Sequence, residues 1–112
     1  MFVVTLRVKP RDSQELTRRL QASLGPILKR NPGFRGYHSI EAEDGVRMGI
    51  IMFETRDDAE AFREASQSVV ENEIVPISGQ PEIVMGEVLF SIRPDGMGAQ
   101  PGTATGEEAR PH

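Results

Sequence analysis

The sequence of 112 residues contains no cysteine, and this absence excludes disulfide bonds, thiolate metal sites and a cysteine nucleophile. It contains only two histidines, and His38 alone lies in the part that we expect to fold, so we expect no metal site. No apolar run approaches the roughly 18 residues of a membrane span. Residues 1–10 lack a basic region followed by a long apolar core, so we expect no signal peptide and a cytoplasmic location.

The chain is acidic, with a net charge of −4 at pH 7 and an isoelectric point near 5.2. Such a chain has no broad electrostatic attraction for nucleic acid or for an anionic membrane. The sequence also lacks a glycine-rich phosphate loop, an HExxH motif and a GxSxG motif. We therefore expect neither nucleic acid nor a membrane as a partner.

Hydrophobic periodicity divides the chain into strands and helices. Alternating apolar residues predict a strand over 2–9, and leucines spaced by four predict an amphipathic helix that begins near Asp12. Gly25 and Pro26 interrupt this helix, so we expect a kink or an early end there. Asp44 and Gly45 together predict a hairpin turn. The other predicted elements are strands over 34–43 and 46–54, a helix over 56–73 and a last strand over 82–92.

This order of elements, βαββαβ, is the ferredoxin-like arrangement. It is an α+β fold in which two helices cover one face of a four-stranded antiparallel sheet. We expect one domain over residues 1–92. Residues 93–112 are rich in glycine, proline, threonine and glutamate, so they have little apolar surface to bury, and we expect a disordered C-terminal tail.

Both faces of the predicted sheet are apolar, although two helices can cover only one of them. On the strand over 46–54, Ile51 and Phe53 alternate with Ile50 and Met52. A contiguous apolar patch exposed to water usually marks an interface or a ligand groove. We therefore expect a homodimer in which the open sheet faces of two copies pack together.

Three residues in the predicted strands carry groups that suit a small-molecule site. His38 titrates near neutrality and could transfer a proton or orient a ligand, although a lone strand histidine is more often a packed or exposed residue. Tyr37 beside it is an aromatic residue with a polar end. Arg7 could bind a substrate carboxylate or enolate through its fork of donors, or it could pair with Glu87 on the last strand.

Two segments resemble the antibiotic biosynthesis monooxygenase family, which belongs to the dimeric α+β barrel superfamily. They are NPGFRGY, from Asn31 to Tyr37, and FETRDDA, from Phe53 to Ala59. The resemblance covers about residues 1–92. It implies a ferredoxin-like subunit, an obligate dimer and a pocket between each sheet and its helices. Some members of the family oxidise polyketide-like phenols or quinols with molecular oxygen and without metal or flavin, whereas others degrade haem.

The sequence departs from the family two residues before the cap of the second helix. Members commonly have a tryptophan there, whereas this chain has Phe53. The resemblance therefore does not extend to haem, and we expect no cofactor. Asn72 and Arg7 supply residue types that the quinone-forming members use, but they match no motif position, and Asn72 could equally cap the second helix.

We therefore predict a cofactor-independent monooxygenase that acts on a small aromatic or polyketide-like substrate. His38 and Arg7 are the predicted catalytic residues, and Tyr37, Phe53 and Asn72 are the predicted substrate-binding residues. The alternative is a non-catalytic module that binds a small hydrophobic ligand or serves dimerisation, since methionine-rich linings adapt to varied ligands. A third possibility is an isomerase or decarboxylase on the same barrel, because a fold alone does not determine the activity.

Overall fold

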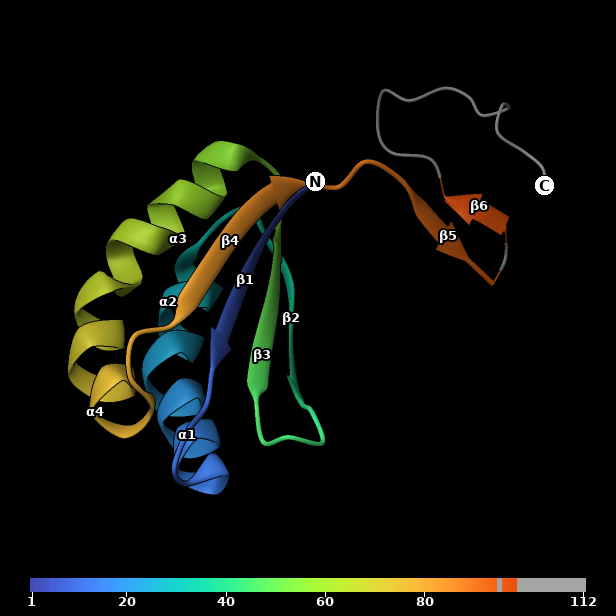
Figure 1. Ribbon diagram of the computed structural model, residues 1–112. Helices are drawn as coiled ribbons and strands as arrows, with labels where there is room; N and C mark the ends of the chain where they lie inside the picture. The colour runs from blue at the N-terminus through green and yellow to red at the C-terminus, as the bar shows by residue number, and fades with distance from the viewer. Residues whose placement is uncertain (95, 99–112) are drawn as a thin grey trace.

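The structure, a computed structural model, describes residues 1–94 and 96–98 (Figure 1). Two of its helical segments contain a π-helical stretch, labelled η, between two α-helical stretches. The elements in chain order are β1 (Phe2–Val8), α1 (Ser13–Arg19), η1 (Leu20–Leu24), α2 (Gly25–Arg30), β2 (Phe34–Glu41), β3 (Arg47–Phe53), α3 (Arg56–Val69), η2 (Val70–Ile74), α4 (Val75–Ser78), β4 (Glu82–Glu87), β5 (Ser91–Arg93) and β6 (Gly96–Gly98).

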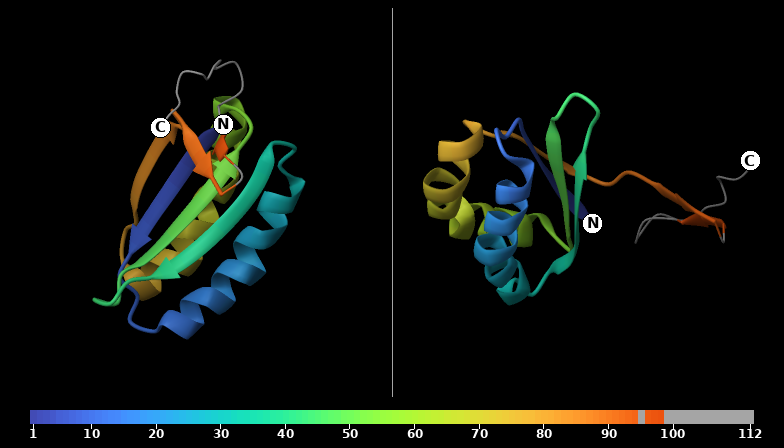
Figure 2. Two further views of the ribbon diagram at one scale, coloured as in Figure 1. Left: turned by 90° about the vertical axis from the view of Figure 1, so that its right-hand side faces the viewer. Right: turned by 90° about the horizontal axis from the view of Figure 1, so that it is seen from below.

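The first four strands form one antiparallel sheet with the order β2-β3-β1-β4. Val4, at the centre of β1, lies opposite Ile51 of β3 and Met85 of β4. Both helical segments lie on the same face of this sheet, and the other face is left open (Figures 1 and 2). The predicted ferredoxin-like α+β fold is therefore confirmed.

Each helical segment continues through a proline that could have ended it. Pro26 stands in the first turn of α2, and Pro76 stands in the first turn of α4. A proline has no N–H to donate, and its ring crowds the preceding turn. The π-helical stretch before each proline widens the helix, so that the N–H of Gly25 bonds to the carbonyl of Leu20. The first helix therefore does not end early, and the second extends to Ser78 rather than to residue 73.

The core lies between the sheet and the helices. Every second residue of β3 is buried on this side, and its last member, Phe53, has no exposed surface. The Phe53 ring lies 5.5 Å from the ring of Phe62 on α3 and 6.4 Å from that of Phe34 on β2, measured between centroids. No helix in the described part of the chain is long and apolar enough to cross a membrane.

The open face of the sheet carries the other half of the alternating strand residues. Met48, Ile50 and Met52 of β3 are only half-buried there. Ile40 of β2 and Val84 of β4 are exposed. The open face therefore presents apolar side chains, as expected, together with the polar residues Thr5, Arg7 and His38.

The last predicted strand breaks into two parts. β4 ends at Glu87, and the N–H of Val88 donates the last hydrogen bond of this edge, to the carbonyl of Met1. After this hydrogen bond the chain leaves the four-stranded sheet, and β5 pairs instead with β6. The domain boundary expected at residue 92 thus falls inside β5, and the tail expected from residue 93 begins with strand residues. The rest of the predicted tail, residues 99–112, lies outside the described residues.

This C-terminal arm, residues 88–94 and 96–98, projects away from the body on the side opposite the helices (Figure 2). Its large apolar side chains are highly exposed: Leu89 at 79%, Phe90 at 69% and Ile92 at 66%. Side chains of this kind gain no burial within the subunit.

Candidate functional site

The structure separates the predicted catalytic residues from two of the predicted substrate-binding residues. Successive side chains of a strand point to opposite faces of a sheet. His38 lies opposite Ile50 on the open face, whereas its neighbour Tyr37 packs against the core on the helix side. Arg7 pairs with Met48 of β3 and also lies on the open face. His38 and Arg7 therefore do not share a pocket with Tyr37 and Phe53.

Arg7 has an acidic partner on β4, but it is Glu82 and not Glu87. The antiparallel register places Glu82 opposite Arg7, and it places Glu87 at the far end of the strand, opposite Phe2. The Arg7 guanidinium lies 3.4 Å from the Glu82 carboxylate, and both side chains are exposed. An ion pair of this kind contributes little to stability.

The remaining predicted substrate-binding residues are not placed on a cavity surface. Phe53 packs against the rings of Phe34 and Phe62 and has no exposed surface, so it belongs to the core. Asn72 is exposed within η2, before the end of the helical segment, and so it does not cap that helix.

An open groove runs between α3 and the edge strand β4, with a volume of about 770 Å³. Its floor is apolar and includes Val4, Leu6 and Phe62. Its rim on α3 is mostly acidic. The charged residues that line it are Asp57, Glu60, Arg63, Glu64 and Glu71.

A second, much smaller cavity of about 30 Å³ lies deeper, between the sheet and both helical segments. This inner cavity shares Leu6, Val70 and Pro81 with the groove, so the two spaces adjoin. Most of its lining is aliphatic. The polar side chains in the lining are those of Tyr37, Ser39 and Arg47. A space of this volume holds about one water molecule, so an aromatic ring needs the walls to move apart.

Arg47 is a polar lining residue that the sequence did not predict. It begins β3 on the helix side and is only 7% exposed. Its Nη1 donates to the carbonyl and to the hydroxyl of Ser13, at 2.9 and 2.8 Å, and its Nη2 donates to the hydroxyl of Ser39 at 2.7 Å. The signal for it was present, because Arg47 occupies the same alternating face of the strand as Ile51 and Phe53.

Tyr37 lies beside Arg47 and packs against the backbone of Gly49. A Cβ at Gly49 would lie 3.1 Å from the Tyr37 ring, so the absence of a side chain there makes room for the ring. Burial raises the pKa of the Tyr37 phenol above its ordinary value, although a hydrogen bond with Ser39 and the charge of Arg47 oppose the shift. The phenol therefore stays protonated at neutral pH and can donate its O–H.

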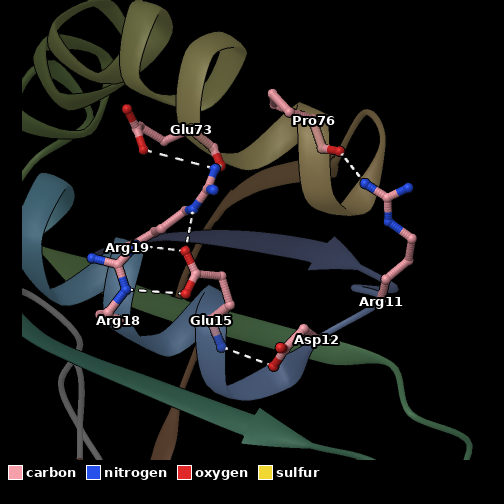
Figure 3. Close-up of polar contacts among 7 residues, drawn as sticks. All are labelled: Arg11, Asp12, Glu15, Arg18, Arg19, Glu73 and Pro76. Atoms are coloured by element: carbon pink, nitrogen blue, oxygen red, sulfur yellow. Dashed lines mark hydrogen bonds and ion pairs between the residues drawn. The ribbon is translucent and has the colours of Figure 1, made fainter.

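A network of charged residues holds the two helical segments together next to the inner cavity (Figure 3). The Arg19 guanidinium donates to the Glu15 carboxylate at 2.8 Å and to the backbone carbonyl of Glu73 in η2 at 2.9 Å. Arg11 donates to the carbonyl of Pro76 in α4. The hydrogen bonds from Arg18 and Arg19 lower the pKa of Glu15 from its ordinary 4.5 to about 2.

The arrangement suits an apolar ligand that carries a negatively charged oxygen. A cation and a phenolic O–H stand at one end of a space whose other walls are aliphatic. In the described part of the chain, no group of three or more histidine, cysteine, aspartate or glutamate side chains could hold a metal ion.

Comparison with known proteins relates this chain to others through its fold. No protein-family model matches the chain, and no curated protein matches its sequence. Rv0793 from Mycobacterium tuberculosis is similar in structure, with a TM-score of 0.65 and 18% identity over 79% of this chain and 94% of that one. SnoaB from Streptomyces nogalater, a cofactor-independent oxygenase, is similar with a TM-score of 0.62 and 13% identity over 78% and 91%. An antibiotic biosynthesis monooxygenase is similar with a TM-score of 0.59 and 14% identity over 79% and 98%.

The chain is therefore a small ferredoxin-like α+β subunit with a cavity between its sheet and its helices. More particularly, it has the fold of the antibiotic biosynthesis monooxygenase proteins, as the NPGFRGY and FETRDDA segments predicted.

Proposed function

We propose that the protein is a cofactor-independent monooxygenase that acts on a small aromatic or polyketide-like substrate. The substrate would bind between the sheet and the helices. The observation that carries the proposal is the pairing of Arg47 with Tyr37 at one end of an apolar cavity, within a fold shared with a cofactor-independent oxygenase.

The chemistry needs a substrate that is itself a reductant. Loss of a proton from an acidic phenol or from an activated ring CH₂ gives an electron-rich anion that can reduce molecular oxygen. One oxygen atom enters the substrate as a carbonyl, and the other leaves as water, so that the substrate supplies the electrons. Arg47 and Tyr37 would stabilise the anion by charge and by hydrogen bonding, which lowers the free energy of deprotonation.

His38 and Arg7 stand on the other face of the sheet, so a substrate in the cavity is separated from them by the sheet itself. We therefore transfer the proposed anion-binding role from Arg7 to Arg47. The catalytic role predicted for His38 has a direct test, because His38→Ala leaves the helix side of the sheet untouched. Loss of turnover in this variant would show that the catalytic site lies on the open face of the sheet.

The test of the proposed function is oxygen uptake with a panel of dihydroxynaphthalenes and anthrones, in the presence of a chelator. We expect uptake that depends on the protein and is slower in Tyr37→Phe, which keeps the ring but removes the donor. Arg7→Gln is the matched control, since it changes an exposed group on the other face. No uptake with any member of the panel would count against a monooxygenase.

One observation favours the alternative, a non-catalytic ligand-binding module. The inner cavity is lined by Tyr37, Ser39 and Arg47 but by no histidine, aspartate or glutamate, so none of its lining side chains is an ordinary proton acceptor at neutral pH. Thermal shift measurements against a library of hydrophobic metabolites separate the two functions. A ligand that raises the melting temperature without being converted identifies the module.

We also propose that two copies of the chain associate through their open sheet faces. The open face presents half-buried Met48, Ile50 and Met52. The arm projects on this same side and exposes Leu89 and Phe90, which a second copy could cover (Figure 2). Burying such surface stabilises association by about 25 cal/mol for each Å² of apolar area removed from water.

Sedimentation velocity tests this association at micromolar concentration. We expect the wild type to sediment as a dimer, and Leu89→Ser combined with Phe90→Ser to shift the equilibrium toward single subunits. Glu64→Gln, on the outer rim of the groove and far from the open face, serves as the control. A wild type that sediments as a single subunit would contradict the proposed dimer.

A further inference from the structure

Arg47 has more hydrogen-bond donors than the subunit provides acceptors for. A guanidinium carries five N–H groups. Three of the five are accounted for by the Ser13 carbonyl, the Ser13 hydroxyl and the Ser39 hydroxyl. The Nε–H and one Nη2–H have no acceptor among the described residues. Buried polar groups are nearly always hydrogen-bonded, so two free donors on a buried side chain require an explanation.

The charge of Arg47 also lacks a counter-ion. None of the ion pairs among the described residues includes Arg47. Glu41 lies opposite Arg47 in the strand register, but its carboxylate accepts from the Ser13 hydroxyl at 3.2 Å rather than from the guanidinium. Burying an uncompensated charge is unfavourable. The guanidinium is joined to the Glu41 carboxylate only through the Ser13 hydroxyl, so it is buried without a direct ion pair.

A purely structural role explains only part of this arrangement. By binding Ser13 and Ser39, Arg47 ties the start of α1 to β2. That role uses the Nη1 donors and one donor of Nη2. It leaves the Nε–H and one N–H of Nη2, and a guanidinium can direct two donors at the two oxygens of a carboxylate.

We propose that Arg47 recognises the anionic oxygen of an aromatic ligand, which is a carboxylate, an enolate or a phenolate. The inference rests on the proposed function in placing the ligand between the sheet and the helices. The ring lies in the enlarged inner cavity, the anionic oxygen accepts from Nε and Nη2 of Arg47, and the Tyr37 hydroxyl is the second donor. The substrate class is thus narrowed to aromatic compounds that are charged when bound.

The neighbouring space explains why the inner side of Arg47 is the binding side. A hollow of about 380 Å³ on the outer side is lined by Arg47 together with Glu41, whose carboxylate repels an anion. The inner side has no acidic residue in its lining. Its wall facing the groove includes Val70 and Pro81, which flank the helix end that Arg19 and Arg11 hold through the carbonyls of η2 and α4. The proposed binding requires outward movement of this helix end, which would enlarge the inner cavity enough to hold a ring.

The test is a calorimetric titration of the full chain with 2-naphthoate and with 2-naphthamide, which have the same ring system and differ in charge. We expect 2-naphthoate to bind at least about tenfold more tightly, as a charged hydrogen-bonded pair allows. We expect Arg47→Gln to remove this preference while leaving the affinity for 2-naphthamide unchanged. Arg63→Gln is the matched control, because Arg63 lies on the rim of the groove and is exposed.

A second variant covers the case in which Arg47→Gln does not fold. Arg47→Lys keeps the positive charge but lacks the fork, and we expect it to lower the affinity for 2-naphthoate and to leave that for 2-naphthamide unchanged. The proposal is overturned if the wild type binds neither probe, if it binds both equally, or if Arg63→Gln rather than either Arg47 variant loses 2-naphthoate. Neither probe has a phenolic proton to lose. If the protein binds 2-naphthoate through Arg47 but shows no oxygen uptake with the phenol panel, the ligand-binding inference holds and only the proposed monooxygenase activity is contradicted.

Discussion

Replacing Phe53 with alanine should greatly destabilise the subunit, because the structure makes this residue the centre of the core rather than part of a binding surface. The side chain has no exposed surface, and its ring packs against Phe62 and Phe34. Truncating a buried phenylalanine to alanine costs about 3–5 kcal/mol. Small domains have a total stability of about 5–15 kcal/mol, so the change removes a large fraction of it.

Urea unfolding followed by circular dichroism measures this change in the free energy of unfolding. For a domain of this size, 3 kcal/mol corresponds to a fall in melting temperature of at least about 12 °C. Phe53→Leu keeps most of the apolar volume and should cost clearly less than Phe53→Ala. A loss below about 1 kcal/mol for the alanine variant would refute the core assignment. It would also reopen the role in substrate binding that the sequence predicted for this residue.

Three further predictions follow from local contacts. The lowered pKa of Glu15 means that its contribution to stability is present above pH 4.5 and is lost as the pH falls toward about 2. The free energy of unfolding should therefore depend less steeply on pH in this range in Glu15→Gln than in the wild type. Equal slopes in the two proteins would contradict the ion pairs of Glu15 with Arg18 and Arg19. Tyr37 is the only tyrosine, so the ultraviolet absorbance of its phenolate reports its pKa directly. We expect titration above pH 10 in the wild type and a shift back toward 10 in Gly49→Ala, whose Cβ displaces the ring; an unperturbed wild-type pKa would show that the phenol is not buried. In the side-chain cap of α3, the Thr55 hydroxyl accepts from the Asp58 N–H. Thr55→Ala removes this cap and should lower the free energy of unfolding, measured with urea, by about 1 kcal/mol. Thr55→Ser keeps a hydroxyl and should retain most of the wild-type stability.

Hydrophobic periodicity was sufficient to predict the element order because each strand alternates and each helix repeats with its own period. It did not predict where the last strand and the two helical segments end, because these ends depend on contacts with other parts of the chain. The strand predicted over 82–92 breaks after Glu87, because residues 91–93 pair with β6 and not with β1. The helices continue past Pro26 and Pro76 because a π-helical stretch absorbs each proline, and residue propensities give no sign of it.

The candidate site, too, was predicted only in part from the sequence. Tyr37 was singled out from the sequence, and it does line the inner cavity. His38 is predicted from the sequence because it is the only histidine in the part expected to fold, but as the neighbour of Tyr37 on a strand it points to the opposite face. Arg47 was overlooked because an arginine beside a hairpin turn is usually a solvated residue. Its burial depends on Ser13 and Ser39, which come from other elements and reach it only in the folded chain.

The sequence by itself determined the ferredoxin-like order of strands and helices, the two apolar faces of the sheet and the absence of cysteine chemistry. These properties depend on local periodicity and on composition, which the chain carries whether or not it is folded. Only the tertiary structure decided which side chains share a cavity. That outcome depends on strand register and on how the helices cover one face. It placed the buried Arg47 beside the partly buried Tyr37, and it placed His38 on the other side of the sheet.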